Sequence, residues 1–425
     1  MAAQRSRFME LGDILRERVA EIDQYLSSQG QPAPSFSKDA PPDHPLPPSL
    51  LRSRDEILEA CSELQALAEG PFMHLTRLTS PAMNVLMSIQ AIYRFNIARN
   101  VAVDEEVSFK ELATRCNIDE HDLSRLMRTA IANHIFHEPR KGFVIHSAIS
   151  KYLAEVPLLH SWIGLVCEEM WPLQHLVVEA IQKWPGSQEQ QHTAYGLANP
   201  DGKSYFEALG EDPTRAQRFS DGMKYLQSAP AFALTHLFTD LGWDTTGVPS
   251  MMVDIGGSRG SVAVELLRKY PTLRCEVQDL AETISQANVP DDLQDRLEFR
   301  AHNFFTEQVR RNADVYFMRS ILHDWPDKYA VQILRNIIPA LKHGSKIIIN
   351  EVCLPEPNTL PFYHAQLLRG YDLAMKMNFN SKERDADEWA ALLKAADPRL
   401  RLGRITCSPG SILSVIEAVW EENTL

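Results

Sequence analysis

A strand-like apolar run followed by a glycine-rich turn constrains the fold of this chain most. The run Met251–Ile255 is short and apolar, as in a buried strand. Gly256, Gly257 and Gly260 follow, and a backbone without Cβ atoms can approach a ligand closely there. The next segment, Ser261–Lys269, spaces its apolar residues as a helix does. Together these features predict a nucleotide-type cofactor site, although ordinary tight turns between a strand and a helix share the pattern.

An acidic residue at the end of the next strand strengthens the prediction of a cofactor site. The apolar run at 273–277 predicts this strand, which ends at Gln278, Asp279 and Leu280. Asp279 lies 19 residues after Gly260, and an acid about 20 residues beyond such a turn can accept hydrogen bonds from both ribose hydroxyls. The spacing alone leaves open whether the cofactor is a dinucleotide or S-adenosylmethionine (SAM).

Length, charge and cysteine usage exclude several classes of protein. The chain has 425 residues, enough for two or three domains. Its net charge of −13 argues against non-specific binding to nucleic acids or anionic membranes, because both are negatively charged. No apolar run approaches the ~18 residues that span a bilayer. The six cysteines are scattered without a CxxC pair, which is typical of free thiols in a reducing compartment. We therefore expect a cytoplasmic protein that binds neither nucleic acid nor membrane.

The pattern along the chain predicts four regions. Residues 8–27 have one apolar helical face, and the Pro- and Ser-rich segment at 30–48 predicts a linker. Because the helix precedes a linker, we expect its apolar face to pack on another subunit or on the body of the protein. The predicted regions are an N-terminal helix and linker at 1–49, a winged-helix-like dimerisation domain at 50–155, a helical substrate-pocket region at 156–245, and a catalytic domain at 246–425.

Residues 107–145 carry the pattern that predicts a winged helix. Ser108 is suited to cap a first short helix, residues 121–131 predict a second, and a hairpin is expected around Arg140 and Lys141. A winged helix can bind DNA, but the second helix carries few basic residues, and a DNA reader needs a basic footprint. We therefore expect this region to serve packing and dimerisation in a homodimer.

From residue 246 onward, predicted strands and helices alternate. This alternation is typical of an α/β fold with a doubly wound, mostly parallel sheet. The last two predicted strands, at 401–407 and 411–419, are separated by Ser408, Pro409 and Gly410. They predict an antiparallel hairpin at the C-terminal side of the sheet.

A second candidate site segment follows the apolar strand predicted at 313–318. It contains His323 and Asp324 directly before a tryptophan. Loops at the carboxyl ends of strands carry the sites of open α/β sheets, so both residues are candidates for acid–base work. Asp324 or Asp327 could instead cap a helix start. We favour a cap for Asp327 and a functional role for His323.

Six short motifs occur together in a specific order. They lie at residues 253–260, 278–280, 301–305, 318–327, 350–355 and 380–384. Each is weak alone, but six in order are specific. With them, residues 50–425 resemble the SAM-dependent O-methyltransferases that act on plant phenolics and fungal secondary metabolites.

The resemblance implies a fold, a cofactor and site residues. The fold would be a Rossmann-like methyltransferase domain, with a mostly parallel seven-stranded sheet and a C-terminal antiparallel hairpin. The cofactor would be SAM without a metal, since no acidic cluster matches that of the Mg²⁺-dependent catechol methyltransferases. His323 would be the catalytic base, flanked by the acids Glu351 and Glu383. The implied SAM-binding residues are Asp254, Gly256, Gly257, Gly260, Asp279, Leu280, Asn303, Phe304 and Arg319.

Three positions depart from the plant pattern of this family. Ser258 replaces a glycine, Asn303 replaces an acid beside the adenine, and Arg319 replaces a lysine. We expect all three replacements to be tolerated.

The implied chemistry is physically consistent. An imidazole of pKa about 6.5 is a poor base for a phenol of pKa about 10, but a nearby carboxylate raises its basicity and fixes its tautomer. The set His323, Glu351 and Glu383 therefore favours methyl transfer to a small hydroxylated aromatic or polyketide-like metabolite. The alternatives are a non-methylating reaction on the same fold, such as a pericyclic rearrangement or dehydration, and a non-catalytic regulatory protein.

Overall fold

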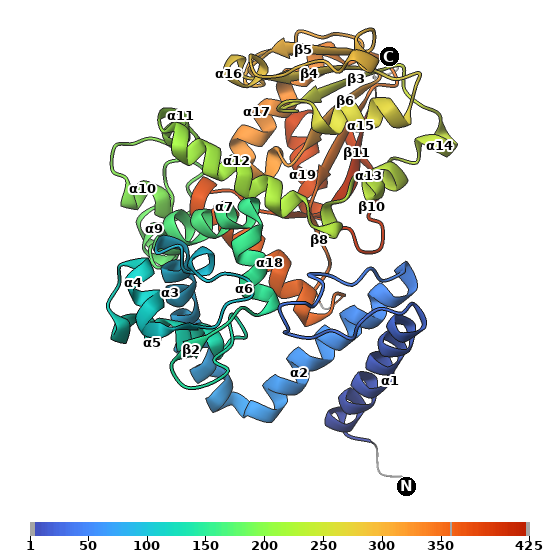
Figure 1. Ribbon diagram of the computed structural model, residues 1–425. Coiled ribbons are helices and arrows are strands. Elements are labelled where there is room, and N and C mark those ends of the chain that lie inside the picture. Colours follow the sequence, from blue (N-terminus) through green and yellow to red (C-terminus); the bar gives the residue numbers. More distant parts are fainter. Residues whose placement is uncertain (1–4, 358, 422–425) are drawn as a thin grey trace. The chain divides into compact units, whose positions relative to one another are not determined.

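The computed structural model describes residues 5–357 and 359–421 (Figure 1). The described chain forms two compact units. The first extends up to Pro172 and includes Asp212–Leu226 and Pro361–Gln366; the second contains Leu173–Glu211, Gln227–Leu360 and the chain from Leu367 onward. The domain boundaries expected from the sequence stay predictions.

The first unit is built mainly from helices (Figure 1). Its long helix α2 is broken at Gly70, which has a non-helical φ of 64° and is followed by Pro71. A proline inside a helix disrupts the hydrogen bonding of the helix. The helices of this unit are α1 (Arg7–Ser28), α2 (Pro48–Thr79), α3 (Pro81–Arg94), α4 (Phe109–Cys116), α5 (Glu120–Ile131), α6 (Ala148–Glu155), α7 (Pro157–Leu165) and most of α12 (Pro213–Gln227).

The N-terminal helix α1 packs along α2 (Figure 1). Its apolar face buries Leu11 and Leu26, and Arg18 forms an ion pair with Glu56 of α2 at 2.6 Å. The helix predicted at 8–27 is thus confirmed. The apolar face was expected to pack on another subunit or on the body of the protein, and in the structure it packs on α2 of the same chain.

The region around α4 and α5 agrees with the predicted helices but corrects the predicted hairpin. Ser108 caps α4 by accepting a hydrogen bond from the amide of Glu111. The expected hairpin around Arg140 is reduced to one bridge between His137 and Ile145. The physical reason is that Phe136 has a φ of 98°, which extended strands do not adopt. Strand β2 (Phe143–Val144) pairs instead with β1 (Val107–Ser108).

The second unit contains the seven-stranded sheet, in the order β10-β11-β7-β6-β3-β4-β5. The pairs among β7, β6, β3, β4 and β5 are parallel, whereas β11 is antiparallel to both β7 and β10. This arrangement confirms the predicted Rossmann-like sheet and its C-terminal hairpin. The strands are β3 (Met251–Ile255), β4 (Arg274–Asp279), β5 (Leu297–Ala301), β6 (Val315–Arg319), β7 (Lys346–Glu351), β10 (Leu400–Thr406) and β11 (Ser414–Trp420).

Helices cover both faces of the sheet (Figure 1). Because side chains alternate along a strand, Ile347 and Ile349 of β7 pack in the core that includes α17 and α19. Ile348 points to the opposite core, with α13 and α15. The helices of this unit are α9 (Val177–Lys183), α10 (Ala194–Ala198), α11 (Tyr205–Glu211), α13 (Leu234–Leu241), α14 (Trp243–Thr246), α15 (Ser261–Lys269), α16 (Ala281–Ile284), α17 (Asp327–Ile337), most of α18 (Phe362–Phe379) and α19 (Ala386–Ala396).

Two short strands bring distant parts of the second unit together. Strand β8 (Cys353–Leu354) follows β7 after one residue and pairs in parallel with β9 (Arg384–Asp385). The pairing places the chain around residue 383 beside the carboxyl end of β7. In the described ranges, no helix is long and apolar enough to cross a membrane.

Candidate active site

The glycine turn after β3 is shaped by close contacts within the second unit. Gly256 has a φ of 72°, and a Cβ added there would lie 2.5 Å from Ile321 Cδ1. Gly260 has a φ of 76°, and its Cβ would lie 2.9 Å from the Phe299 ring. A side chain would strain the backbone at both positions, and at Gly260 it would also collide with the Phe299 ring. Ser258 adopts a φ of 53°, a conformation that is uncommon for residues other than glycine.

Asp279 at the end of β4 is held against the glycine turn. Its Oδ2 accepts a hydrogen bond from the amide of Ser258 at 2.9 Å, and its Oδ1 accepts one from the amide of Leu280 at 2.7 Å. A carboxylate offers about four lone-pair positions. Asp279 is thus oriented by two backbone groups and retains acceptor capacity for a ribose.

Asp254, which is buried, and Arg319, which is half-buried, influence each other electrostatically. Asp254 is 2% exposed, and none of the described residues provides a hydrogen bond to its Oδ2. Burial and the charge of Asp279 raise the pKa of Asp254 to about 7, while Arg319 opposes the shift. Arg319 donates to Asn350 Oδ1 at 2.6 Å and to the carbonyl of Phe232 at 2.9 Å. Burial lowers the pKa of Arg319 to about 10 despite the charge of Asp254.

Asn303 and Phe304 lie in the turn after β5. The side chain of Asn303 accepts a hydrogen bond from the amide of Phe305 at 2.9 Å, so it stabilises this turn. The rings of Phe304 and Trp325 meet edge to face at 5.7 Å. Phe304 therefore belongs to an aromatic wall next to the segment that carries His323.

His323 and Glu383 are in direct contact. The Nδ1 of His323 lies 2.9 Å from Glu383 Oε1, and Glu383 is 2% exposed. The other ring nitrogen, Nε2, lies 3.7 Å from Asp324 Oδ1. Burial lowers the pKa of His323, but the charges of Asp324, Glu383 and Glu351 outweigh it and raise the pKa to about 10.

Glu351, the second predicted acid, contacts the backbone beside His323. Its Oε1 accepts hydrogen bonds from the amides of Ile321 at 2.8 Å and Leu322 at 2.6 Å. Burial raises the pKa of Glu351. The structure thus brings all three predicted catalytic residues together, with Glu383 on the imidazole and Glu351 on the loop before it.

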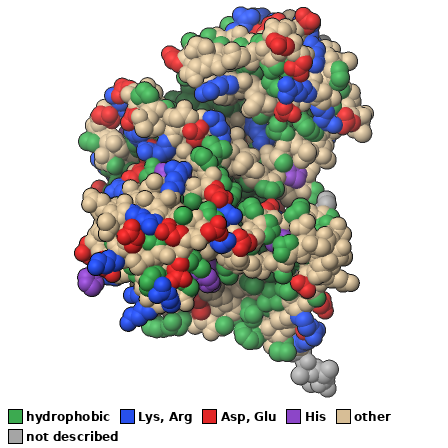
Figure 2. Space-filling view, viewed as in Figure 1, with side chains coloured by type: hydrophobic (Ala, Val, Ile, Leu, Met, Phe, Trp, Pro, Cys, Tyr) green, Lys and Arg blue, Asp and Glu red, His purple; other side chains and the backbone are tan. Residues whose placement is uncertain are grey.

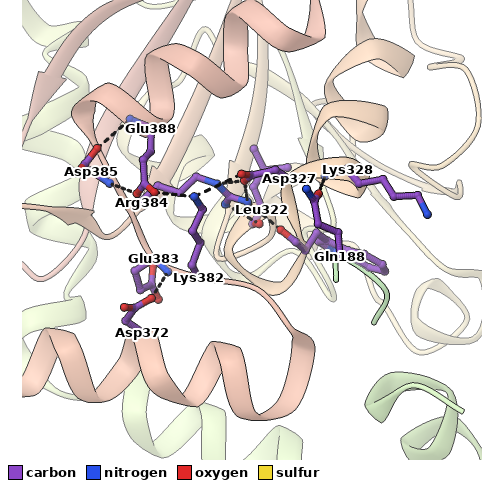
Figure 3. Close-up of polar contacts among 11 residues, drawn as sticks. Gln188, Leu322, Asp327, Lys328, Asp372, Lys382, Glu383, Arg384, Asp385 and Glu388 are labelled. Atoms are coloured by element: carbon purple, nitrogen blue, oxygen red, sulfur yellow. Dashed lines mark hydrogen bonds and ion pairs between the residues drawn. The ribbon is translucent and has the colours of Figure 1, made fainter. Parts of the chain in front are cut away.

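Sequence reasoning gave no role to Arg384, and it named Asp324 only as a candidate for acid–base work or as a helix cap. Burial raises the pKa of Asp324 to about 7, against the effect of His323; its position next to the histidine was a signal for it. The helix-cap interpretation of Asp327 is wrong, because Pro326 occupies the cap of α17 and Asp327 is the first helical residue. Asp327 instead accepts hydrogen bonds from Arg384 at 2.8 and 2.9 Å (Figure 3).

Comparison with known proteins identifies the family. Residues 179–397 match the model of an O-methyltransferase domain. The O-methyltransferase kk1A of Curvularia clavata is 48% identical over 424 residues, covering 100% of both chains. The chain belongs to this O-methyltransferase family. The alignment with this relative covers both chains in full, so the similarity is not confined to the cofactor domain.

Solved structures give the same fold with its cofactor. The structure of LepI in complex with SAM is 26% identical, with a TM-score of 0.72 over 96% of this chain and 100% of that one. A structure described as a pericyclic reaction enzyme matches with the same identity, TM-score and coverage. The methyltransferase uses SAM as its cofactor. The glycine turn, the oriented carboxylate of Asp279 and the unpartnered Asp254 oxygen fit a group with a ribose and an amino acid portion.

Proposed function

We propose that this methyltransferase moves a methyl group from SAM to a hydroxyl of a small aromatic or polyketide-like secondary metabolite in the cytoplasm, with His323 as general base. The observation that carries the proposal is the 2.9 Å contact of His323 Nδ1 with the buried carboxylate of Glu383. The pair lies in loops beyond the carboxyl ends of strands, where sites of open α/β sheets lie.

The second unit would hold SAM along the carboxyl ends of β3, β4 and β6. Asp279 would accept the ribose hydroxyls, since its carboxylate is already oriented by Ser258 and Leu280. Gly256, Gly257 and Gly260 would let the backbone approach, and Asp254 and Arg319 would face the amino acid portion. Asn303 and Phe304 would lie beside the adenine. When bound, SAM supplies a methyl group on a positively charged sulfur.

His323 would take the proton of the substrate hydroxyl at Nε2. Glu383 accepts the hydrogen of Nδ1, which fixes the tautomer and stabilises the imidazolium that forms. A base of pKa about 10 matches a phenol of pKa about 10, so proton transfer between them is nearly balanced. Near neutral pH, however, most of the free enzyme would hold His323 protonated.

Turnover is therefore expected to rise with pH. His323 must be neutral to accept a proton, and its raised pKa of about 10 places the acid limb of the pH profile of kcat/KM on the alkaline side of neutrality. In Glu383→Gln the loss of the anion lowers the pKa of His323. The limb should shift to lower pH while the plateau falls at least about tenfold, because the weaker base transfers the proton less readily.

The matched control for that experiment is Glu388→Gln. Glu388 completes the capping box of α19 by accepting from the amide of Asp385 at 3.2 Å, and its neutralisation should leave the limb in place. A Glu383→Gln profile that superimposes on that of the wild type would contradict the assigned contact between Glu383 and His323.

An aromatic cluster that includes Trp325, two residues after His323, supports a flat, apolar substrate. Phe206 and Phe379 stack with centroids 4.9 Å apart and an interplanar angle of 13°, and Phe206 also stacks near Trp325 at 6.4 Å. Aromatic rings pack favourably against other rings through offset or edge contacts. A hydroxylated aromatic metabolite would pack against such rings better than a highly polar one.

The proposal is tested by incubating the protein with SAM and a panel of phenolic and enolic metabolites. Mass spectrometry should show a product heavier by one methyl group, together with S-adenosylhomocysteine. A product of unchanged mass would favour the non-methylating alternative. The observation behind that alternative is the likeness to a pericyclic reaction enzyme. The 48% identical relative is an O-methyltransferase, which favours methyl transfer.

We further propose that the first unit forms a homodimer, with residues 50–155 as a winged-helix-like dimerisation domain. It presents large apolar side chains to solvent, here called the α2–α3 apolar surface, and Figure 2 shows apolar side chains gathered in the lower part of that view. Such patches mark protein interfaces. Its members are Phe72 (78% exposed), Met73, Leu75, Leu78, Met83 and Met87.

Light scattering at micromolar concentration is expected to give the mass of two chains. Phe72→Asp should lower it to that of one chain, because the new charge would be buried at the interface. Val309→Asp is the control, since Val309 is 55% exposed in the second unit. A wild-type protein with the mass of one chain would refute the homodimer.

A further inference from the structure

We infer that Arg384 is a positioning residue for methyl transfer, which fixes the loop that carries His323 against the segment that carries Glu383. The inference rests on the proposed role of His323 as base. Figure 3 shows Arg384 reaching from β9 toward Leu322 and Asp327. Neither cofactor binding nor proton transfer by itself assigns a role to this arginine.

Arg384 is fully buried, with 0% of its surface exposed. Its Nη1 donates to the carbonyl of Leu322 at 3.0 Å, and its Nη2 donates to the carbonyl of Trp325 at 2.9 Å. These two carbonyls lie immediately before and shortly after His323. The guanidinium therefore spans the single turn from which the imidazole projects.

Asp327 holds the guanidinium in place. Its Oδ1 accepts from Nε at 2.9 Å and from Nη2 at 2.8 Å, and Lys382 lies 3.4 Å from its Oδ2. The neighbouring arginine offsets burial and lowers the pKa of Asp327. The buried positive charge of Arg384 is thus paired, as burial of a charge requires.

The same loop is held from its other side by Glu351. Its Oε1 accepts the amide hydrogens of Ile321 and Leu322, whereas Arg384 takes the carbonyls of Leu322 and Trp325. Donors and acceptors of one short loop are therefore fixed by two oppositely charged, buried side chains. Such an arrangement restricts the backbone of His323 far more than a surface loop would be restricted.

Arg384 also connects this loop to Glu383, its neighbour in sequence. Cys353 of β8 pairs with Arg384 in β9, and the guanidinium carbon lies 5.2 Å from the centre of the Trp389 ring. The residue that follows Glu383 is thereby fixed by a strand pairing and a ring contact. The side chain that bonds the His323 loop and the carboxylate that bonds the imidazole consequently move as one piece.

Only arginine has the geometry for these contacts. Its planar guanidinium offers five donors in a fixed fork, whereas a lysine ammonium is a single point with three rotatable donors. Arg384→Lys keeps the charge opposite Asp327 but cannot reach both carbonyls at once. The His323–Glu383 distance should then loosen without loss of either group.

Arg384→Lys is expected to lower kcat about 100-fold, the loss that follows a misplacement of about 1 Å. The dissociation constant of S-adenosylhomocysteine, measured by calorimetry, should change less than about twofold, because Arg384 bonds no residue of the glycine turn. The control is Arg335→Lys: Arg335 also donates to two backbone carbonyls, of Ala396 at 3.1 Å and Ala395 at 2.8 Å, away from His323. Its kcat should stay at the wild-type value.

The outcomes separate this inference from the proposed function. If Arg384→Lys has the kcat of the wild type while His323→Ala is inactive, the inference about Arg384 is overturned and the proposed function stands. If His323→Ala is active, the proposed role of His323 as base is overturned. Equal losses of kcat and cofactor affinity in Arg384→Lys would indicate a merely structural role and also overturn the inference. If Arg384→Lys does not fold, Asp327→Asn provides the test. Its kcat should fall about tenfold at unchanged cofactor affinity, and an unchanged kcat would overturn the inference.

Discussion

His323→Ala is expected to abolish measurable methyl transfer while leaving SAM binding intact. A positioned general base contributes about 10²–10⁴ in rate, and the described loop offers no second imidazole to replace it. Asp324 is the acid–base group on the Nε2 side of the imidazole, 3.7 Å from Nε2, but a carboxyl whose pKa is about 7 remains a much weaker base toward a phenol than His323. Turnover is measured as transfer of a labelled methyl group to the product.

The binding half of this prediction separates catalysis from folding. His323 shares no hydrogen bond with Asp279 or with the glycine turn in the described structure, so the affinity for S-adenosylhomocysteine should match that of the wild type in calorimetry. His121→Ala, an exposed position in the first turn of α5, is the control and should retain full turnover. Undiminished turnover in His323→Ala would remove the histidine as base.

The parts of the site that sequence predicts are those set by local structure. The strand Met251–Ile255, the glycine turn and Asp279 follow each other along one β-α-β segment, so spacing alone determines that they meet. The positive φ of Gly256 and Gly260 likewise follows from the residue type. His323 follows a buried strand and could be placed at the same sheet edge on that ground.

Other contacts depend on pairing between distant segments, so periodicity and spacing do not predict them, and the contact of Glu383 with His323 was expected only from the resemblance. Glu383 reaches His323 because β9 pairs with β8, which joins Cys353 to Arg384. This pairing is a tertiary contact, which no periodicity reports. Arg384 itself runs against expectation, because arginine is almost never fully buried unless paired, and its partner Asp327 was interpreted as a helix cap.

The same distinction explains Glu351 and α1. A strand pattern shows that Glu351 ends β7, but its partner is a backbone loop whose course depends on Ser320, with a φ of 53°. The helix α1 was predicted from its apolar face, whereas its packing on α2 depends on how the chain returns after the linker. Elements were therefore predictable from their patterns, whereas the partners of their side chains were not, apart from the acids that the resemblance placed beside His323.

Asp279→Ala is expected to raise the dissociation constant of SAM at least about 100-fold. A carboxylate that accepts two ribose hydroxyls makes charge-assisted hydrogen bonds of about 1.5–3 kcal/mol each, and about 2.7 kcal/mol corresponds to 100-fold. The variant also loses the bonds to the amides of Ser258 at 2.9 Å and Leu280 at 2.7 Å, so the turn itself becomes less ordered. The affinity is measured by calorimetry with SAM and with S-adenosylhomocysteine.

Asp279→Asn tests whether charge or shape carries this effect. The asparagine keeps one acceptor oxygen and the size of the side chain, but its amide nitrogen cannot accept a hydrogen bond. Its dissociation constant should fall between those of the wild type and the alanine variant. Glu298→Gln on β5 is the control, because it neutralises a 55% exposed carboxylate on the same sheet and should leave binding unchanged. Equal affinity of Asp279→Ala and the wild type would show that the acid at the end of β4 does not bind the ribose, and the glycine turn alone would then have to hold the cofactor.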